Sequence, residues 1–188
     1  MTARTRPGSR IRVLIDEPAI AKRVRELGAE LCRDYAGRRP VLIAVLKGGS
    51  VFLSDLIRTM DIDLEIDFIG LTSYGMEQTS SGKVRLVHDL RDDVHGRDVI
   101  LVEGVVDTGY SLRFLIDLLQ QRQPKSIKVC ALLDKVPCRK MPVPVDYAGF
   151  RIGEEFIIGY GMDAAETFRQ LPYIGVVEPE SPGPGPGE

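Results

Sequence analysis

Short runs of Val, Ile and Leu alternate along the chain with segments in which apolar residues recur every three or four positions. The continuous runs are typical of strands buried on both faces of a parallel sheet, and the recurring positions are typical of one face of a helix. The chain therefore predicts an α/β fold, with an open, mainly parallel sheet flanked by helices. Strands are predicted at residues 41–46, 99–102 and 127–133, and helices between Asp16 and Gly37, at about residues 51–60 and at residues 112–119.

Other segments follow weaker patterns. Residues 61–68 alternate between acidic and apolar side chains, which predicts a half-buried strand with an acidic outer face. The stretch from Ser73 to Gly82 is rich in Gly, Ser, Thr and Gln and is bounded by strand-like residues, so we expect a mobile loop or a long hairpin there. Short strands are predicted at residues 145–150, 155–160 and 173–177, and a turn or a one-turn helix at residues 163–168.

One domain accounts for the length of the chain. At about 100–200 residues per domain, 188 residues predict a single domain, which we place at residues 11–178. Residues 1–10 are basic and aperiodic, so a flexible arm is expected. Residues 179–188 are rich in Pro and Gly and predict a disordered tail.

The composition argues against several classes of protein. A net charge of −2 gives no sign of a nucleic-acid surface, and the three cysteines form no C-x-x-C pair, so disulfides and zinc are not expected. No apolar run approaches the ~20 residues of a membrane span, and the first ten residues lack the apolar stretch of a signal peptide. We expect a cytoplasmic protein with neither nucleic-acid nor membrane partners.

Residues 99–112, V-I-L-V-E-G-V-V-D-T-G-Y-S-L, combine a buried strand, a tight loop and the start of a helix. Such a loop directs free backbone N–H groups and the positive end of the helix dipole to one point, which predicts a phosphate site. Thr108 and Ser111 add hydroxyl groups. Glu103 and Asp107 flank the site, and carboxylates beside a phosphate need sugar hydroxyls, a Mg²⁺ ion or a transferable proton as partners. The alternative is an ordinary strand followed by an Asx turn.

Three further segments are expected beside this one. Ligands of open α/β sheets bind at the carboxyl ends of the strands. Residues 47–49, 103–111, 134–135 and 159–163 are all placed at or near such ends, so they predict one shared cleft.

The motifs together resemble type I phosphoribosyltransferases, in particular their hypoxanthine-guanine branch. The resemblance is carried by a hydrophobic strand with an acid before D-T-G-x-[ST], by L-K-G-G, S-Y-G and L-L-D-K, and by E-F-I-I-G-Y-G-M-D followed by F-R. It covers about residues 11–178. It implies the family's sheet with a small hood of short strands and loops from the chain ends, a homodimer or homotetramer, and a Mg²⁺-dependent reaction of phosphoribosyl diphosphate (PRPP) with a 6-oxopurine.

The resemblance also implies roles for residues around the purine. Asp107 is expected near N7 of the purine as the general base, although an Asx-turn role is compatible with this. Lys135 can donate to an exocyclic oxygen but cannot accept from an amino group, so it would select 6-oxopurines. Phe156 would stack on the base and the backbone of Ile157 would read its edge, while the side chain of Ile157 is expected in the core.

The remaining implied roles concern PRPP and the metal. Substrate contacts are implied for the backbone amides of Lys47 and Gly48 at the pyrophosphate, for Ser73 and Tyr74 in a lid and for Glu103 at the ribose. They are also implied for Thr108, Gly109, Tyr110 and Ser111 at the phosphate and for Arg169 at the pyrophosphate. Asp163 and Glu103 are implied as Mg²⁺ ligands. The alternative for Lys47 is a solvated surface position. The alternative for residues 73–74 is a plain surface hairpin.

Gly104 departs from the family pattern, which usually has a second acid at this place. We expect this departure to weaken the hold on the ribose and to raise the KM for PRPP. The sequence therefore predicts a purine salvage transferase that makes IMP, and also GMP, with release of pyrophosphate. A regulatory protein that binds PRPP or a nucleotide on the same fold is the alternative, and Gly104 is its main support.

Overall fold

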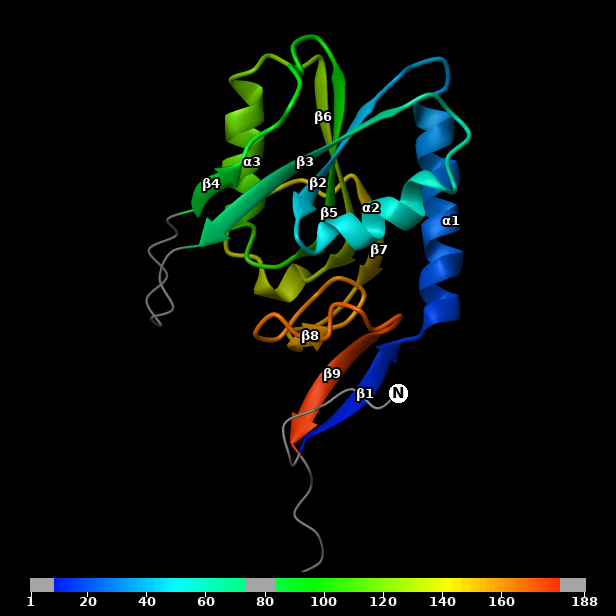
Figure 1. Ribbon diagram of the computed structural model, residues 1–188, viewed down its shortest axis with the longest axis vertical. Coiled ribbons are helices and arrows are strands. Elements are labelled where there is room, and N and C mark those ends of the chain that lie inside the picture. The colour runs from blue at the N-terminus through cyan, green and yellow to red at the C-terminus, as the bar shows by residue number, and fades with distance from the viewer. Residues whose placement is uncertain (1–8, 74–83, 180–188) are drawn as a thin grey trace, which may run out of the picture.

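A computed structural model describes residues 9–73 and 84–179 of the chain. The main sheet has six strands in the order β4-β3-β2-β5-β6-β7 (Figure 1). All neighbouring strands in it are parallel except the edge pair of β3 and β4. The strands are β2 (Val41–Leu46), β3 (Glu65–Ser73), β4 (Val84–His88), β5 (Asp98–Val106), β6 (Ser126–Asp134) and β7 (Tyr147–Arg151). This arrangement confirms the predicted α/β class and its open, mainly parallel sheet.

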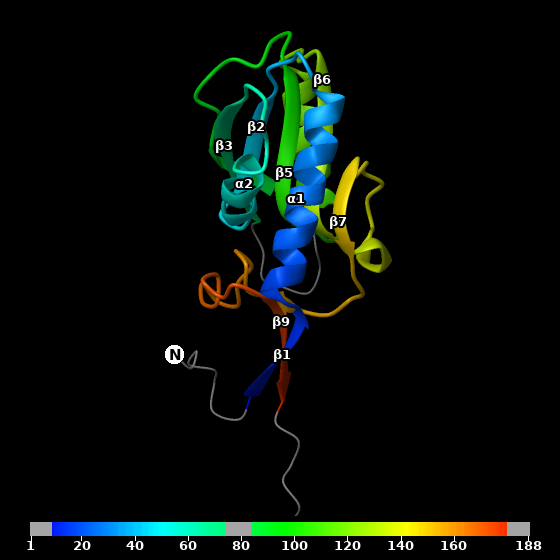
Figure 2. The ribbon, with the colours of Figure 1, turned by 90° about the vertical axis from the view of Figure 1, so that its right-hand side faces the viewer.

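Three helices cover the two faces of the sheet, and Figure 2 views the molecule from the side on which two of them lie. Helices α1 (Glu17–Asp34) and α2 (Gly49–Ile57) pack on one face, and α3 (Tyr110–Gln120) packs on the other. The predicted apolar stripe of α1 is buried, and so is that of α3. β5 is apolar on both faces because it lies between these two layers.

A second, antiparallel sheet forms the predicted hood. It has the order β1-β9-β8, with β1 (Ser9–Ile15), β8 (Ile157–Ile158) and β9 (Ile174–Pro179). The strands β1 and β9 join the two ends of the chain, and in Figure 1 this sheet lies below the carboxyl ends of the main strands. A cleft between the two sheets is therefore walled by segments far apart in the sequence.

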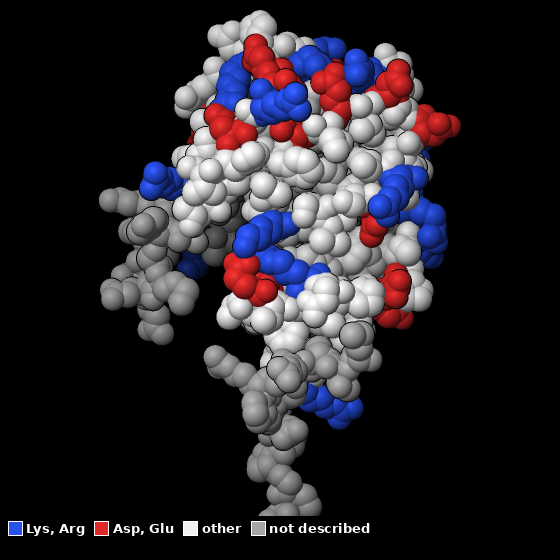
Figure 3. All heavy atoms as spheres, in the orientation of Figure 1, with Lys and Arg blue, Asp and Glu red and all other residues white. Residues whose placement is uncertain are grey.

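The surface carries charges of both signs. On the face drawn in Figure 3, acidic and basic side chains are interspersed. This mixture agrees with the net charge of −2.

Several predicted boundaries hold and several shift. Asp16 caps α1, since its side chain accepts a hydrogen bond from the backbone N–H of Ala19 at 2.9 Å. Helix α2 begins at Gly49, two residues earlier than predicted, and ends at Ile57 instead of residue 60. β1 begins at Ser9 and β9 includes Pro179, so the expected arm and tail each overlap a strand. Residues 1–8 and 180–188 lie outside the described residues.

The prediction for residues 61–68 is wrong in two respects. The strand β3 starts at Glu65, and residues 61–64 precede it as a bend. Asp67 is buried instead of facing solvent, because its carboxylate accepts hydrogen bonds from the backbone N–H groups of Phe68 and Arg91. A carboxylate satisfied by backbone donors can occupy an apolar position of the alternating pattern.

The segment from residue 155 to residue 168 is less regular than predicted. Only Ile157–Ile158 forms a strand, and Phe156 precedes it. Residues 163–168 form a turn, closed by hydrogen bonds in both directions between Ala164 and Thr167, and no helix.

Candidate active site

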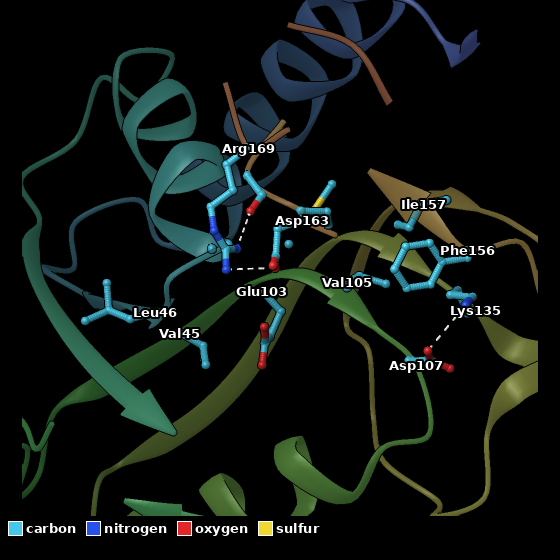
Figure 4. Close-up of a pocket in the computed structure, with 15 residues that line it drawn as sticks. Val45, Leu46, Glu103, Val105, Asp107, Lys135, Phe156, Ile157, Asp163 and Arg169 are labelled. Atoms are coloured by element: carbon cyan, nitrogen blue, oxygen red, sulfur yellow. Dashed lines mark hydrogen bonds and ion pairs between the residues drawn. The ribbon is translucent and has the colours of Figure 1, made fainter. Parts of the chain in front are cut away.

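A cavity of about 280 Å³ opens between the carboxyl ends of the main strands and the hood. Its walls come from the four segments that the sequence predicts at one cleft and from five further residues. The segments contribute residues 48–49, residues 103–105 with Asp107, Lys135, and residues 161–163, and the further residues are Val45, Leu46, Phe156, Ile157 and Arg169. Figure 4 shows Asp107, Lys135 and Phe156 at one end of this cavity and Asp163 and Arg169 at the other, with Glu103 below Asp163 in this view. The predicted shared cleft is thus present.

Asp107 and Lys135 meet because they follow neighbouring parallel strands. Val106 of β5 is in register with Asp134 of β6, and the backbone N–H of Lys135 donates to the carbonyl of Val106 at 3.0 Å. The residues that follow then lie side by side, with Lys135 Nζ 3.3 Å from Asp107 Oδ2. The side chain of Lys135 is 7% exposed and that of Asp107 is 49% exposed. A buried ammonium therefore stands beside an accessible carboxylate at the floor of the cavity.

Phe156 and Ile157 form the wall above this pair. Phe156 is 63% exposed, and its ring lies beside Lys135 and above Asp107 in Figure 4. Ile157 lies in β8 with its side chain in the core, as predicted. An apolar ring left this open is available to cover a flat ligand.

A second cavity, of about 100 Å³, adjoins the first at Glu103 and Asp107 and is also lined by Thr108, Gly109 and Ser111 at the start of α3. The first turn of a helix leaves backbone N–H groups without intrahelical partners, so this cavity has the electrostatics of a phosphate site. Gly109 has a φ of 90°, and a Cβ there would lie 2.6 Å from the carbonyl oxygen of Met141. Tyr110 begins α3 but does not line either cavity.

Glu103 is shared by both cavities. Burial raises the pKa of this carboxyl to about 8 from an ordinary value of 4.5, although part of its surface remains open to the cavity. Desolvation is the whole cause, and no basic group contributes an opposing effect. A cation or sugar hydroxyls at this point would favour the ionised form of Glu103.

The far end of the cavity carries an ion pair between Arg169 and Asp163. The guanidinium NH2 lies 2.7 Å from Asp163 Oδ1, and NH1 donates to the carbonyl oxygen of Gly161 at 2.8 Å. Both side chains are about three-quarters buried. The loop from Gly159 to Met162, tied by hydrogen bonds between its ends, places this pair opposite Asp107.

The predicted residues of the loop after β2 separate into two groups. Gly48 lines the cavity, whereas Lys47 has a largely exposed side chain that points to Glu166, with Nζ 2.7 Å from Oε2. The peptide bond between Leu46 and Lys47 is cis. The predicted lid contributes Ser73, which ends β3 and pairs with Val84, while Tyr74 lies outside the described residues.

The structure adds two residues that sequence reasoning missed, Arg139 and Glu166. Arg139 forms a buried ion pair with Asp134, which belongs to the predicted segment 134–135, and Glu166 pairs with Lys47. Neither residue gave a signal in the sequence, because their partners come from tertiary folding.

Glu103 and Asp163 provide hard oxygen donors on opposite walls of one cavity, which is the donor chemistry of Mg²⁺. In residues 9–73 and 84–179, no group of three or more His, Cys, Asp or Glu side chains is arranged around a common metal position. The donor set therefore fits an ion that takes most of its ligands from water and substrate. Among these same residues, no helix has both the length and the apolar character needed to span a membrane.

Comparison with known proteins agrees with this geometry. The family model of the phosphoribosyl transferase domain matches residues 13–165. A hypoxanthine-guanine phosphoribosyltransferase from Bacillus subtilis (strain 168) is 46% identical over 168 residues, which cover 89% of this chain and 93% of that protein. The bifunctional protein TilS/HprT of Listeria innocua is 45% identical over 90% of this chain, and this chain spans 26% of its length.

The fold is likewise similar to a solved structure. A hypoxanthine-guanine phosphoribosyltransferase from Bacillus anthracis superposes with a TM-score of 0.84 at 42% identity, over 90% of this chain and 99% of that chain. This chain belongs to the hypoxanthine-guanine phosphoribosyltransferase family.

Proposed function

We propose that this chain transfers the 5-phosphoribosyl group of PRPP to hypoxanthine and guanine, giving IMP or GMP and pyrophosphate. The observation that supports this most strongly is the single cavity that has Asp107, Lys135 and the exposed ring of Phe156 at one end and the charged pair of Asp163 and Arg169 at the other. A phosphate-sized cavity adjoins it at the start of α3.

The base lies between Phe156 and the pair of Asp107 and Lys135. The exocyclic oxygen of a 6-oxopurine accepts from Lys135, and the neighbouring N7–H donates to Asp107. The backbone of Ile157 contacts the edge of the base. Adenine presents an amino group to Lys135, which leaves a buried cation without an acceptor.

PRPP occupies the rest of the site. Its 5-phosphate accepts from the loop of Thr108, Gly109, Tyr110 and Ser111, and its ribose hydroxyls donate to Glu103. Its pyrophosphate group meets Gly48, Lys47 and Arg169. Ser73 and Tyr74 belong to a lid that excludes water from the reacting atoms.

Glu103 and Asp163 would hold a Mg²⁺ ion together with water and diphosphate oxygens, and the bound ion would supply positive charge for the leaving group. The reaction forms a bond from a purine ring nitrogen to C1 of the ribose and breaks the bond from C1 to the diphosphate oxygen. The electron pair leaves with pyrophosphate, and the proton of the base passes to Asp107. The oxocarbenium character of the transition state makes positioning and charge stabilisation the main contributions of the protein.

Further proposals concern the setting of the enzyme. We place it in the cytoplasm, as a homodimer or homotetramer, without nucleic-acid or membrane partners. The relatives from Bacillus subtilis and Bacillus anthracis are both named as phosphoribosyltransferases, and neither supports the regulatory alternative.

A panel of bases tests this proposal. With PRPP and Mg²⁺, hypoxanthine and guanine should be converted to their nucleotides, and adenine should be a very poor substrate. The rate with xanthine measures how well the site accepts a base with a second exocyclic oxygen. Chelation of the metal by EDTA should abolish product formation. Efficient AMP synthesis would overturn the substrate assignment.

A further inference from the structure

The carboxylate of Glu166 bridges two cations that lie on different segments of the chain. One oxygen, Oε2, lies 2.7 Å from Lys47 Nζ and 3.5 Å from Arg169 NH2. Lys47 follows β2, whereas Arg169 follows the turn of residues 164–167. Lys47 and Arg169 are both residues assigned to the pyrophosphate group, so this inference rests on the function proposed above.

The backbone around Glu166 is held in an uncommon conformation. Ala165 and Glu166 have φ values of 49° and 65°, which L residues with a side chain rarely adopt. The turn is fixed by hydrogen bonds between Ala164 and Thr167 in both directions, and by the N–H of Glu166, which donates to Asp163 Oδ2 at 2.8 Å. A strained turn that persists because its surroundings fix it is a feature of functional sites. Here it presents a carboxylate to the two cations.

The charges around the cavity are paired with one another in this state. Lys135 pairs with Asp107, and Arg169 pairs with Asp163. Glu166 pairs with Lys47 and also lies near the same NH2 group of Arg169 that pairs with Asp163. Lys47 and Arg169 also hold the pKa of Glu166 below its ordinary value, so its carboxylate is ionised at neutral pH. A diphosphate that binds these two cations has to displace this carboxylate.

We propose that Glu166 acts as an internal competitor of the diphosphate group. Its carboxylate occupies Lys47 and Arg169 when the site is free, leaves them when PRPP binds, and returns as pyrophosphate departs. It thereby weakens the binding of PRPP and pyrophosphate and favours release of the product. The effect is moderate, because Glu166 and Lys47 are each 66% exposed and exposed ion pairs are screened by water and salt.

Isothermal titration calorimetry of the full chain with inorganic pyrophosphate, in the presence of Mg²⁺, tests this proposal. Glu166→Gln keeps the size of the side chain and removes its charge, so pyrophosphate should bind about 3- to 10-fold more tightly, and the KM for PRPP should fall by a similar factor. The difference should shrink in about 0.5 M NaCl, since salt screens the lost repulsion.

Asp117→Asn is the matched control. It removes one negative charge from another exposed ion pair, with Arg113 on α3, and leaves the cavity residues in place. It should leave pyrophosphate affinity unchanged. Unchanged or weaker binding in Glu166→Gln, equal tightening in Asp117→Asn, or no pyrophosphate binding by the unaltered chain would each overturn the proposal. IMP formation by the unaltered chain is measured separately, because its absence would overturn the proposed function and leave the pyrophosphate comparison valid.

Discussion

Lys135 Nζ lies 3.3 Å from Asp107 Oδ2, so a buried donor and an accessible acceptor stand side by side at the end of two neighbouring parallel strands. A 6-oxopurine carries the complementary pair along one edge, with an acceptor at the exocyclic oxygen and a donor at N7–H. Adenine carries an amino donor where the oxygen would be. The spacing of these two side chains is therefore a physical basis for selecting the base.

Lys135→Met should lower kcat/KM for hypoxanthine by about 10- to 100-fold, because a hydrogen bond from a charged group contributes about 1.5–3 kcal/mol. Steady-state kinetics with hypoxanthine at saturating PRPP measures this. Lys140→Met, an exposed lysine on the same loop, is the control and should behave as the unaltered chain. Equal activity in Lys135→Met would remove Lys135 from the recognition of the base.

Asp107→Asn should reduce kcat by about 10²-fold or more, while the binding of PRPP persists, because the amide cannot take the proton of the base. Single-turnover rates together with PRPP titration separate the two quantities. If PRPP binding falls by the same factor as kcat, Asp107 contributes to the binding of PRPP and does not act as the general base.

Gly104→Asp tests the departure from the family pattern. A Cβ at Gly104 would lie 3.1 Å from Met162 Sδ and 3.4 Å from the carbonyl carbon of Gly48, so the flexible thioether has to shift slightly. The added carboxylate faces the cavity, and we expect the KM for PRPP to fall by about tenfold, since a hydrogen bond to a charged group contributes about 1.5–3 kcal/mol. Gly104→Ala fills the same space without a charge and should give no gain. A higher KM in both variants would show that the glycine is required for space.

The pH dependence of stability follows from Glu103, whose pKa burial raises from 4.5 to about 8. Between these values the folded chain holds a proton that the unfolded chain has released, so stability falls as the pH rises, and levels off above about pH 8. Glu103→Gln carries no titrating proton and should lose less stability between about pH 5 and about pH 9. Urea unfolding without Mg²⁺ or PRPP measures both curves, and parallel curves would contradict the raised pKa.

Arg139→Met should destabilise the fold, because Asp134 would remain buried without its cation. The side chain of Asp134 is 8% exposed and that of Arg139 is 16% exposed. Removing one partner of a buried ion pair costs about 3–5 kcal/mol of folding stability. At about 2–4 °C per kcal/mol this lowers the Tm by about 6–20 °C. The double variant Asp134→Asn/Arg139→Met should recover much of the loss. A Tm no higher in the double variant than in Arg139→Met would mean that packing, and not charge, causes the loss.

The sequence predicted those parts of the site that depend on strand ends. Asp107, Lys135 and the start of α3 follow apolar runs whose parallel pairing brings them together, so one pattern yields both the fold and the position of the residues. Phe156 and Asp163 came from the family resemblance, since the irregular chain around them shows no periodicity.

Other features depend on tertiary contacts without a local signature. Asp67 looks like an outer-face acid in the alternating pattern, and only the folded chain supplies the backbone donors that bury it. Glu166 carries no signal beyond its spacing to Arg169, because its position depends on two left-handed residues that the sequence does not mark with Gly or Asn.

Quantifying both products of one reaction tests the central claim most directly. The unaltered chain is incubated with saturating PRPP, hypoxanthine and Mg²⁺, and IMP and pyrophosphate are measured over time. The account predicts that they appear together in equal amounts, and that neither appears when hypoxanthine is omitted. Tight nucleotide binding without IMP formation would contradict it, as would pyrophosphate released without the base.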